Sequence, residues 1–176
     1  MARKKKYVSE SKVTMTELVL PNDTNTLHNL MGGRLMHWMD IASAICAQKH
    51  SNRIVVTASV DNISFQKPIS LGDVVTLQAQ VTRAFNSSME IFVRVKSEDV
   101  PGGTSEITHS AFFTFVAVDQ GGRPIDVPEV VPETDEEKEL YAGALRRRQL
   151  RLVLAKRMKP TDANELKALF FDNDHE

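Results

Sequence analysis

The sequence predicts an α+β protein in which an antiparallel sheet wraps around one central helix. Segments rich in β-branched residues recur along the chain, and short turn sequences separate them as antiparallel neighbours require. One segment alone has the apolar spacing of a buried helix, and it lies between the first and second strands. The order of one strand, one helix and four strands therefore indicates a single α+β core.

The elements follow one another with clear punctuation. The first strand is expected over residues 13–20, where the residues alternate, and Pro21 then breaks it. A long loop leads to Gly32 and Gly33. The helix is expected from residue 34 to about residue 50, with its buried face at positions 35, 38, 39, 42, 45 and 46. The other strands are expected over residues 54–65, 74–84, 89–97 and 107–118.

The composition changes after residue 123. Prolines at positions 124, 128 and 132 indicate a connector, and an acidic run over residues 133–139 suits the start of a helix. Basic residues dominate from residue 146 to residue 159. We therefore expect three regions: a disordered basic N-terminus over residues 1–10, the α+β domain over residues 11–123, and a connector with a helical extension over residues 124–176.

Bulk properties exclude several classes of protein. The 176 residues are 41% hydrophobic and 26% charged, which is typical of a soluble globular protein. The 22 basic and 23 acidic side chains nearly cancel, so the sequence does not indicate a nucleic-acid binder. No apolar run reaches the roughly 18–20 residues of a membrane span. The single cysteine, and a basic start without a following apolar stretch, predict a cytoplasmic protein.

One carboxylate stands within the apolar helix. Asp40 is flanked by Trp38, Met39 and Ala42, and burying it there is costly unless it is hydrogen-bonded or used in chemistry. Apolar surroundings would also make it a stronger base than a solvated aspartate. The preceding loop adds an asparagine, and the Gly32-Gly33 pair places free N–H groups at the helix start. Such groups suit the attack of water on a carbonyl.

These residues resemble a known family. Asp23-Thr24-Asn25, Gly32-Gly33 and Met39-Asp40 resemble the signature of hotdog-fold acyl-CoA thioesterases, and more closely the bacterial acyl-CoA hydrolases related to mammalian brain acyl-CoA hydrolase. Further similar segments are residues 65–69, Gly72-Asp73, Arg83 with Ser87-Ser88, and residues 113–119. The resemblance spans residues 11–123 and implies a hotdog fold with acyl-CoA as substrate and no metal or redox cofactor. It also implies a homodimer as the minimal active unit, assembling into a hexamer.

The resemblance further implies roles for single residues. Asp40 matches the catalytic acid on the helix of one subunit, and acts either as a base towards water or as a nucleophile. Asn25 matches a catalytic asparagine from the facing subunit, and Gly33 is the expected oxyanion donor. The residues expected to bind coenzyme A are Gly32, Lys67, Arg83, Ser87 and Ser88.

Two other functions compete with a thioesterase. A hotdog enoyl-CoA hydratase would need a histidine beside its aspartate on the loop, and His28 is the only one nearby. A non-catalytic acyl-CoA sensor would bind without hydrolysis, with only the basic tail to relay the signal. Asn25 also suits a structural Asx-turn, and the histidines, His109 among them, lack the spacing of metal ligands. Cys46 is expected to be a small core residue.

Overall fold

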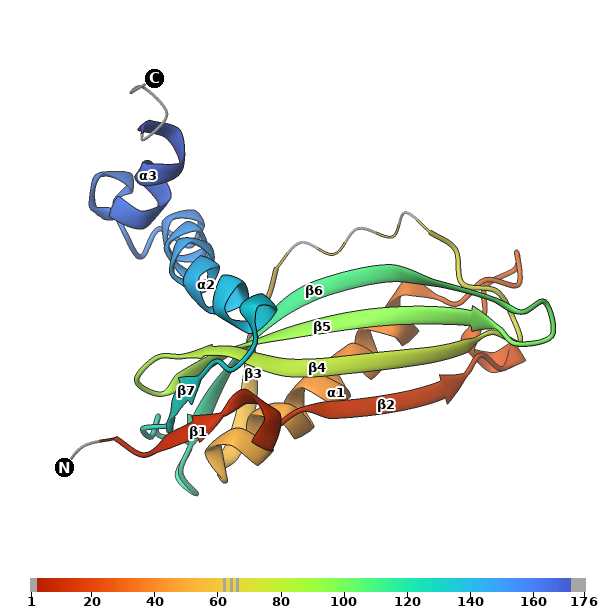
Figure 1. Cartoon of the computed structure of the whole chain (residues 1–176), viewed down its shortest axis with the longest axis horizontal. Helices are drawn as coiled ribbons and strands as arrows, with labels where there is room; N and C mark the ends of the chain where they lie inside the picture. The colour runs from red at the N-terminus through yellow and green to blue at the C-terminus, as the bar shows by residue number, and fades with distance from the viewer. Residues whose placement is uncertain (1–2, 62, 64, 66, 172–176) are drawn as a thin grey trace. The chain divides into compact units, whose positions relative to one another are not determined.

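The computed structural model describes residues 3–61, 63, 65 and 67–171, and the chain forms two compact units, Met1–Val131 and Pro132–Glu176. The first unit contains a five-stranded antiparallel sheet in the order β2-β4-β5-β6-β3 (Figure 1). The strands are β2 (Val13–Leu18), β3 (Ile54–Val60), β4 (Val74–Ala84), β5 (Ser88–Asp99) and β6 (Thr104–Val118). The predicted α+β class and element order are confirmed.

Helix α1 (Gly32–Ser51) lies against one face of this sheet and fills its concave side (Figure 1). Large apolar residues occupy the first half of its buried face and small ones the second half, where they let the sheet approach closely. That face carries Leu35, Trp38, Met39, Ala42, Cys46 and Ala47. Ile45, which the spacing assigns to the same face, is instead 41% exposed. The apolar stripe therefore continues onto a side of α1 that the described residues leave exposed.

Strand β3 is an edge strand and is shorter than predicted. The sequence predicts a strand over residues 54–65, but pairing with β6 ends at Val60 opposite Phe113. One more backbone hydrogen bond follows, from the N–H of Asp61 to the carbonyl of Phe112, whereas residues 62 and 64 of the predicted strand lie outside the described residues. Pairing with β6 also shifts register between Thr57 and Ser59, so a β-bulge bends this edge.

The N-terminal segment differs from the expectation of disorder. Strand β1 (Lys5–Tyr7) pairs in parallel with β7 (Glu129–Val131), and the next residue, Val8, is buried. Three-residue strands carry too few residues for an alternating pattern, so the sequence did not reveal them. The first compact unit consequently continues past residue 123, the predicted end of the domain, to Val131.

The second unit is helical, as predicted. Helix α2 (Asp135–Leu154) begins with a capping box, in which the Thr134 hydroxyl accepts from the Glu137 N–H at 3.2 Å and the Glu137 carboxylate accepts from the Thr134 N–H at 3.1 Å. Helix α3 (Asn164–Phe171) follows, and the N–H of Leu166 donates to the side chain of Gln149 on α2. No helix in the described part of the chain combines the length and apolar character that crossing a bilayer requires.

Candidate active site

The loop before α1 is fixed by one buried carboxylate. One oxygen of Asp23 accepts the N–H of Leu20 at 3.0 Å, and the other forms an ion pair with the Nε of Arg34 at 2.9 Å. The backbone carbonyl of Asp23 also accepts the N–H of Met31 at 2.9 Å. These bonds join both ends of the loop to the first turn of α1, so the residues between them have a defined position.

Within this loop the side chain of Asn25 is oriented by the backbone. Its Oδ1 accepts the N–H groups of Leu27 at 2.9 Å and Asn29 at 3.2 Å, which is an Asx-turn. The side-chain carbonyl is therefore occupied, and the amide nitrogen is the group left to contact a ligand. His28 adopts a left-handed backbone conformation with φ of 57° to close the turn. The structural role of Asn25 thus determines which end of its amide is presented.

A pocket of about 290 Å³ lies beside this asparagine. Asn25, Asn29, Gly32, Lys67 and His109 border it. The rest of its wall is apolar, made by Leu30, Leu35, Phe65, Pro68 and Ile69. Gly32 is the first residue of α1, and the helix has no side-chain cap at this end. Its N–H group therefore has no intrahelical acceptor and stands at the positive end of the helix dipole. A carbonyl oxygen in this pocket would meet the donors that stabilise an oxyanion.

The structure separates the two glycines that the sequence places together. Gly32 borders the pocket, and a β-carbon at this position would lie 3.2 Å from the ring of Phe65. Gly33, the residue predicted as oxyanion donor, borders a different and more open hollow with Met31, Arg34 and His37. Successive helical residues point about 100° apart, which accounts for the separation. In this geometry Gly32 is the better placed donor.

Asp40 lies further along the same helix and is half-buried, not fully buried as predicted. Its Oδ1 accepts a hydrogen bond of 2.8 Å from the hydroxyl of Thr57, which stands at the β3 bulge. Asp40 forms no ion pair with any other residue that the structure describes. The contact with Thr57 orients the carboxylate and leaves its second oxygen available.

One chain does not bring Asp40 to the pocket. Eight residues of α1 separate it from Gly32, which corresponds to about 12 Å along the helix axis. A bound carbonyl that contacted Gly32 and Asn25 would therefore be out of reach of this carboxylate. The predicted catalytic residues form two half-sites in the chain: Asn25 with Gly32, and Asp40 with Thr57.

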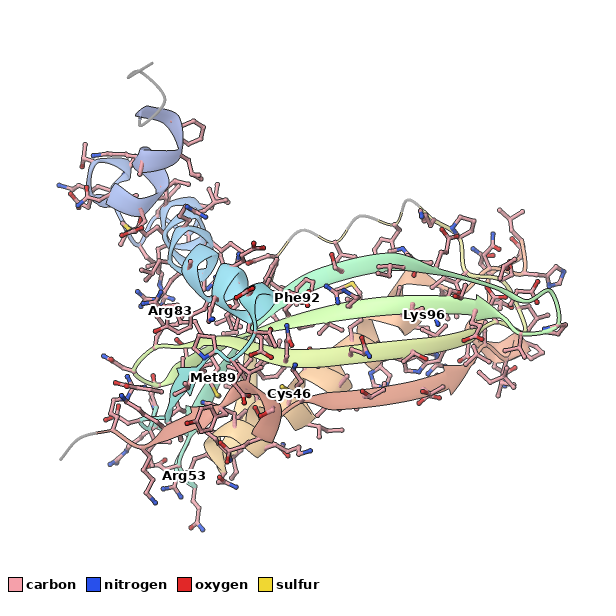
Figure 2. The ribbon with its side chains drawn as sticks, in the orientation of Figure 1. Cys46, Arg53, Arg83, Met89, Phe92 and Lys96 are labelled. Atoms are coloured by element: carbon pink, nitrogen blue, oxygen red, sulfur yellow. The ribbon has the colours of Figure 1, made fainter. Side chains whose placement is uncertain are left out.

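The predicted coenzyme A residues are likewise divided. Lys67 borders the pocket and pairs with Glu106 at 2.5 Å, with both side chains exposed. Arg83, Ser87 and Ser88 belong to the β4–β5 hairpin, beyond a register shift between Val81 and Arg83. Figure 2 shows Arg83 and Lys96 towards opposite ends of these two strands. Lys67 pairs with Glu106, which lies opposite Ser97 near Lys96. An 11-residue strand spans about 35 Å, so Lys67 and the hairpin residues cannot reach the same phosphate within one chain.

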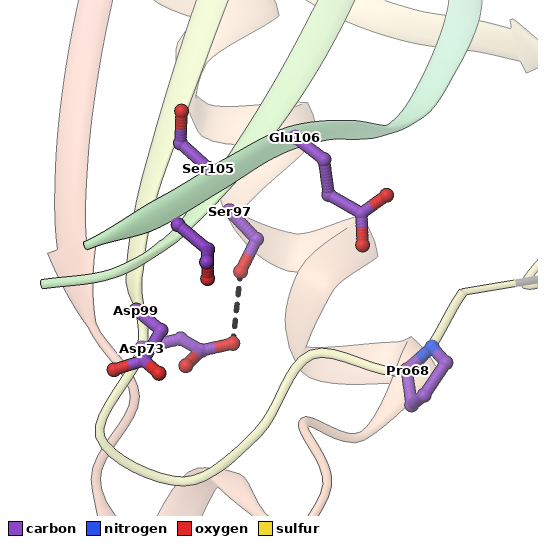
Figure 3. Close-up of a pocket in the computed structure, with 7 residues that line it drawn as sticks. Pro68, Asp73, Ser97, Asp99, Ser105 and Glu106 are labelled. Carbon is purple, nitrogen blue, oxygen red and sulfur yellow. Dashed lines mark hydrogen bonds between the residues drawn. The ribbon is translucent and has the colours of Figure 1, made fainter. Parts of the chain in front are cut away.

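A second, smaller pocket of about 150 Å³ lies near Lys67, and it is acidic (Figure 3). Asp73, Asp99 and Glu106 border it, and Asp73 accepts hydrogen bonds from the Ser97 hydroxyl at 2.9 Å and from the Ser70 N–H at 3.0 Å. Its carboxylates would repel phosphate, so this pocket does not suit coenzyme A. Among the described residues, no group of three or more potential ligands is arranged to hold a metal ion.

The remaining reactive side chains of the core have structural surroundings. Burial raises the pKa of the Cys46 thiol to about 12, which keeps it protonated and inert, in agreement with its predicted role as a core residue. His50 is fully buried near the end of α1, and its Nε2 forms a 3.0 Å hydrogen bond with the carbonyl of Pro128. Burial also lowers the pKa of His50, so it is neutral at pH 7.

Sequence reasoning missed Thr57. A threonine in a β-branched segment is an ordinary strand residue, and nothing in its neighbours distinguishes it. Only the bulge at Thr57 and the packing of β3 beside α1 bring its hydroxyl to Asp40. A functional carboxylate such as Asp40 is expected to have a hydrogen-bond partner. That expectation was the one signal available in the sequence, and it does not identify which residue the partner is.

Known proteins are similar in both sequence and fold. A family model described as the thioesterase superfamily matches residues 27–103. The chain is 45% identical over 142 residues to the "uncharacterized acyl-CoA thioester hydrolase YkhA" of Bacillus subtilis, which covers 81% of this chain and 83% of that protein. An apo-hexameric acyl-CoA thioesterase of known structure has a TM-score of 0.84 and 41% identity, over 86% of this chain and 97% of the other.

A second solved structure contains ligands. It is the acyl-CoA hydrolase of Staphylococcus aureus in complex with butyryl coenzyme A, coenzyme A and coenzyme A disulfide, with a TM-score of 0.80 and 41% identity over 86% of this chain and 94% of that one. Three further structures of that hydrolase carry alanine in place of an aspartate, an asparagine or a threonine. The resemblance noted in the sequence is confirmed at both levels: this chain belongs to the thioesterase superfamily and has the hotdog fold.

Proposed function

We propose that this thioesterase hydrolyses acyl-CoA to a free carboxylic acid and coenzyme A, at a site shared by two subunits. The observation that carries the proposal is the half-site made by Asn25 and Gly32. The Asx-turn leaves the amide nitrogen of Asn25 free, and the first N–H of α1 has no intrahelical acceptor in the same pocket. Two converging donors of this kind match the oxygen of a thioester carbonyl.

In the proposed reaction Asp40 of one subunit accepts a proton from water. The water oxygen forms a bond to the thioester carbon, and the carbonyl oxygen gains the negative charge that Asn25 and Gly32 of the other subunit stabilise. When this intermediate collapses, the carbon–sulfur bond breaks. The proton held by Asp40 then passes to the leaving thiolate, which returns the carboxylate to its starting state and requires no metal or redox cofactor.

The Staphylococcus aureus structures support the choice of residues. In that hydrolase the substituted asparagine precedes the substituted aspartate by fifteen residues, and the substituted threonine follows it by seventeen. Asn25, Asp40 and Thr57 have the same order and spacing in this chain. The same three residue types therefore stand at matching positions in two chains of 41% identity. The agreement favours one site built from the two half-sites.

A second copy of the chain would bring the half-sites together. The surface around Asp40 and Thr57 is apolar, since their sequence neighbours Ile41 and Val56 are 36% and 48% exposed. Ile45, one turn further along α1, is also exposed, and β3 offers an open sheet edge to a partner strand. An acyl-CoA thioesterase of similar fold is hexameric. We infer a homodimer as the active unit, within a hexamer.

The same assembly would reunite the proposed coenzyme A ligands. Lys67 at the pocket and the hairpin residues Arg83, Ser87 and Ser88 lie too far apart in one chain to hold one molecule. Contributions from neighbouring subunits would place cations at both the pyrophosphate and the 3′-phosphate. We also propose a cytoplasmic location, which suits the buried free thiol of Cys46.

The decisive experiment measures thiol release from a panel of acyl-CoAs, from acetyl-CoA to palmitoyl-CoA. Wild type should release coenzyme A, whereas Asp40→Ala and Asn25→Ala should each lose about 10²-fold or more in kcat. Asp135→Asn is the matched control, because this carboxylate is 99% exposed on the other unit. Tight binding without thiol release would instead favour an acyl-CoA sensor, and turnover of enoyl-CoA in its place would favour a hydratase.

Subunit mixing tests whether the site is shared. Unfolding and refolding a mixture of the inactive Asp40→Ala and Asn25→Ala chains should restore activity, because each mixed dimer contains one site with neither substitution. Random pairing would return about a quarter of wild-type activity. Refolded dimers without any recovered activity would mean that both residues act within one chain, and the proposed shared site would be wrong.

A further inference from the structure

His109 of β6 is a buried histidine that borders the same pocket as Asn25 and Gly32. Its side chain is 6% exposed, and neither ring nitrogen has a hydrogen-bond partner among the described residues. The ring packs against Phe65, with 5.6 Å between the centroids. Buried polar groups in proteins are nearly always hydrogen-bonded, so two unpartnered nitrogens at a pocket wall indicate a missing partner.

The local structure of β6 directs this side chain inward. Pairing with β5 shifts register between Val95, which lies opposite His109, and Lys96, which lies opposite Ile107. Beyond the shift, Ala111 and Phe113 are buried at alternating positions, and His109 stands on their side of the strand. Regular alternation along β6 thus turns His109 inward, at a position where the pattern would otherwise place an apolar residue.

His109 is neutral under ordinary conditions. Burial lowers its pKa, and the positive charge of the nearby Lys67 lowers it further. Glu106 is the carboxylate that pairs with this lysine. A neutral imidazole has one N–H donor and one nitrogen acceptor, so it can bind an uncharged polar group without introducing charge into the pocket.

We propose that His109 is a substrate-contacting residue, whose imidazole hydrogen-bonds a carbonyl or amide group next to the reacting thioester. This inference rests on the proposed function. Asn25 and Gly32 already supply two donors for the thioester oxygen, whereas an imidazole with one donor and one acceptor matches an amide, which offers one of each. The arm of coenzyme A that ends in the sulfur contains such amides. An acyl chain with its own carbonyl or hydroxyl would present the same chemistry.

The test compares His109→Phe with His109→Asn. Phenylalanine keeps a ring against Phe65 but cannot hydrogen-bond, and asparagine keeps a donor and an acceptor. We expect His109→Phe to bind and hydrolyse acyl-CoA about tenfold less well, which corresponds to the loss of one hydrogen bond. His109→Asn should recover part of this loss. The phenylalanine variant should be at least as stable as wild type in urea, because it removes two unsatisfied buried groups.

Binding measurements with two ligands identify the part of the substrate that His109 contacts. Equal loss of affinity for free coenzyme A and for an acyl-CoA thioether analogue would place His109 on the amide arm. Loss confined to the thioether analogue would place it on the acyl side. Both results support a substrate contact, whereas unchanged affinity and unchanged kinetics in His109→Phe would overturn it.

A spectroscopic readout is independent of turnover. In wild type labelled with ¹⁵N-histidine, addition of free coenzyme A or the thioether analogue should shift the ring-nitrogen signals of His109. His50 is the internal control, because it is also buried but already bonds Pro128 away from the pocket. Ligand shifts that occur without any thiol release by wild type would retain the contact and reject the proposed hydrolysis. Thiol release with unmoved His109 signals would reject the contact alone.

Discussion

Replacing Thr57 by valine tests the link between the β3 bulge and the proposed base. Valine has nearly the same shape and strand preference as threonine, so the variant should fold normally. It lacks only the hydroxyl that donates to Asp40 at 2.8 Å. The carboxylate would then lose its one observed orienting contact, and the Asn25–Gly32 half-site that binds the thioester oxygen would be unchanged.

The structure sets the size of this effect. A hydrogen bond to a charged group contributes about 1.5–3 kcal/mol. Thr57 is exposed and Asp40 is half-buried in the single chain, so water replaces part of the lost bond. We therefore take the lower end of the range, about 1.5 kcal/mol, which is a decrease in kcat of slightly more than tenfold. KM should change little, because the hydroxyl orients the base and does not contact the pocket.

Steady-state thiol release from one acyl-CoA measures both parameters. Thr57→Ser is the matched control, since it retains the hydroxyl and should stay within about threefold of wild type. In the Asp40→Ala background, Thr57→Val should cause no further loss, because the group it orients is absent. Full activity in Thr57→Val, or an undiminished additional loss in the double variant, would refute the reasoning.

Three other outcomes are expected. Gly32→Pro removes the proposed oxyanion donor at the first helical position, where proline is tolerated, and should lower kcat by about 10²-fold. Gly32→Ala keeps the N–H and should lower kcat much less. Equal kcat values in the two variants would exclude the donor. His28→Gly should relieve the backbone strain of a left-handed residue with φ of 57° and raise the free energy of unfolding by up to about 1 kcal/mol. Turnover of acyl-CoA should persist. Loss of turnover would favour the hydratase. Burial lowers the pKa of both His50 and His109 below the ordinary value of 6.5, so at lower pH the unfolded chain binds more protons than the folded chain. The urea midpoint should therefore fall as the pH drops below 6.5. His109→Phe should make the midpoint depend less on pH.

Local pattern was sufficient to predict much of the fold. The helical spacing after Gly33 predicted α1 to within two residues at its start, and alternation predicted the strands that build the sheet. The acidic start of the tail also has a direct local cause, the capping box of Thr134 and Glu137. Such features depend on residues a few positions apart, which a single sequence displays.

The features that the sequence did not predict depend on contacts between residues far apart in the chain or on rotation about a helix axis. The pairing of β1 with β7 joins segments that share no pattern, and the contact between Thr57 and Asp40 requires a bulge at one position. The choice between Gly32 and Gly33 is a rotation of about 100° on one helix turn. The exposure of Ile45 has a different cause. The apolar spacing along α1 predicts which helix face is buried, but it does not identify what packs against that face.

The parallel pairing of β1 with β7 also has a consequence for synthesis of the protein. Arg3 hydrogen-bonds the carbonyl of Val127, 124 residues away in the sequence, and Lys5–Tyr7 has its partner strand only at Glu129–Val131. During translation β1 therefore cannot pair with β7 until nearly three quarters of the chain has been synthesised. A chain shortened at residue 123 would lack β7, and β1 would then have lost its partner strand.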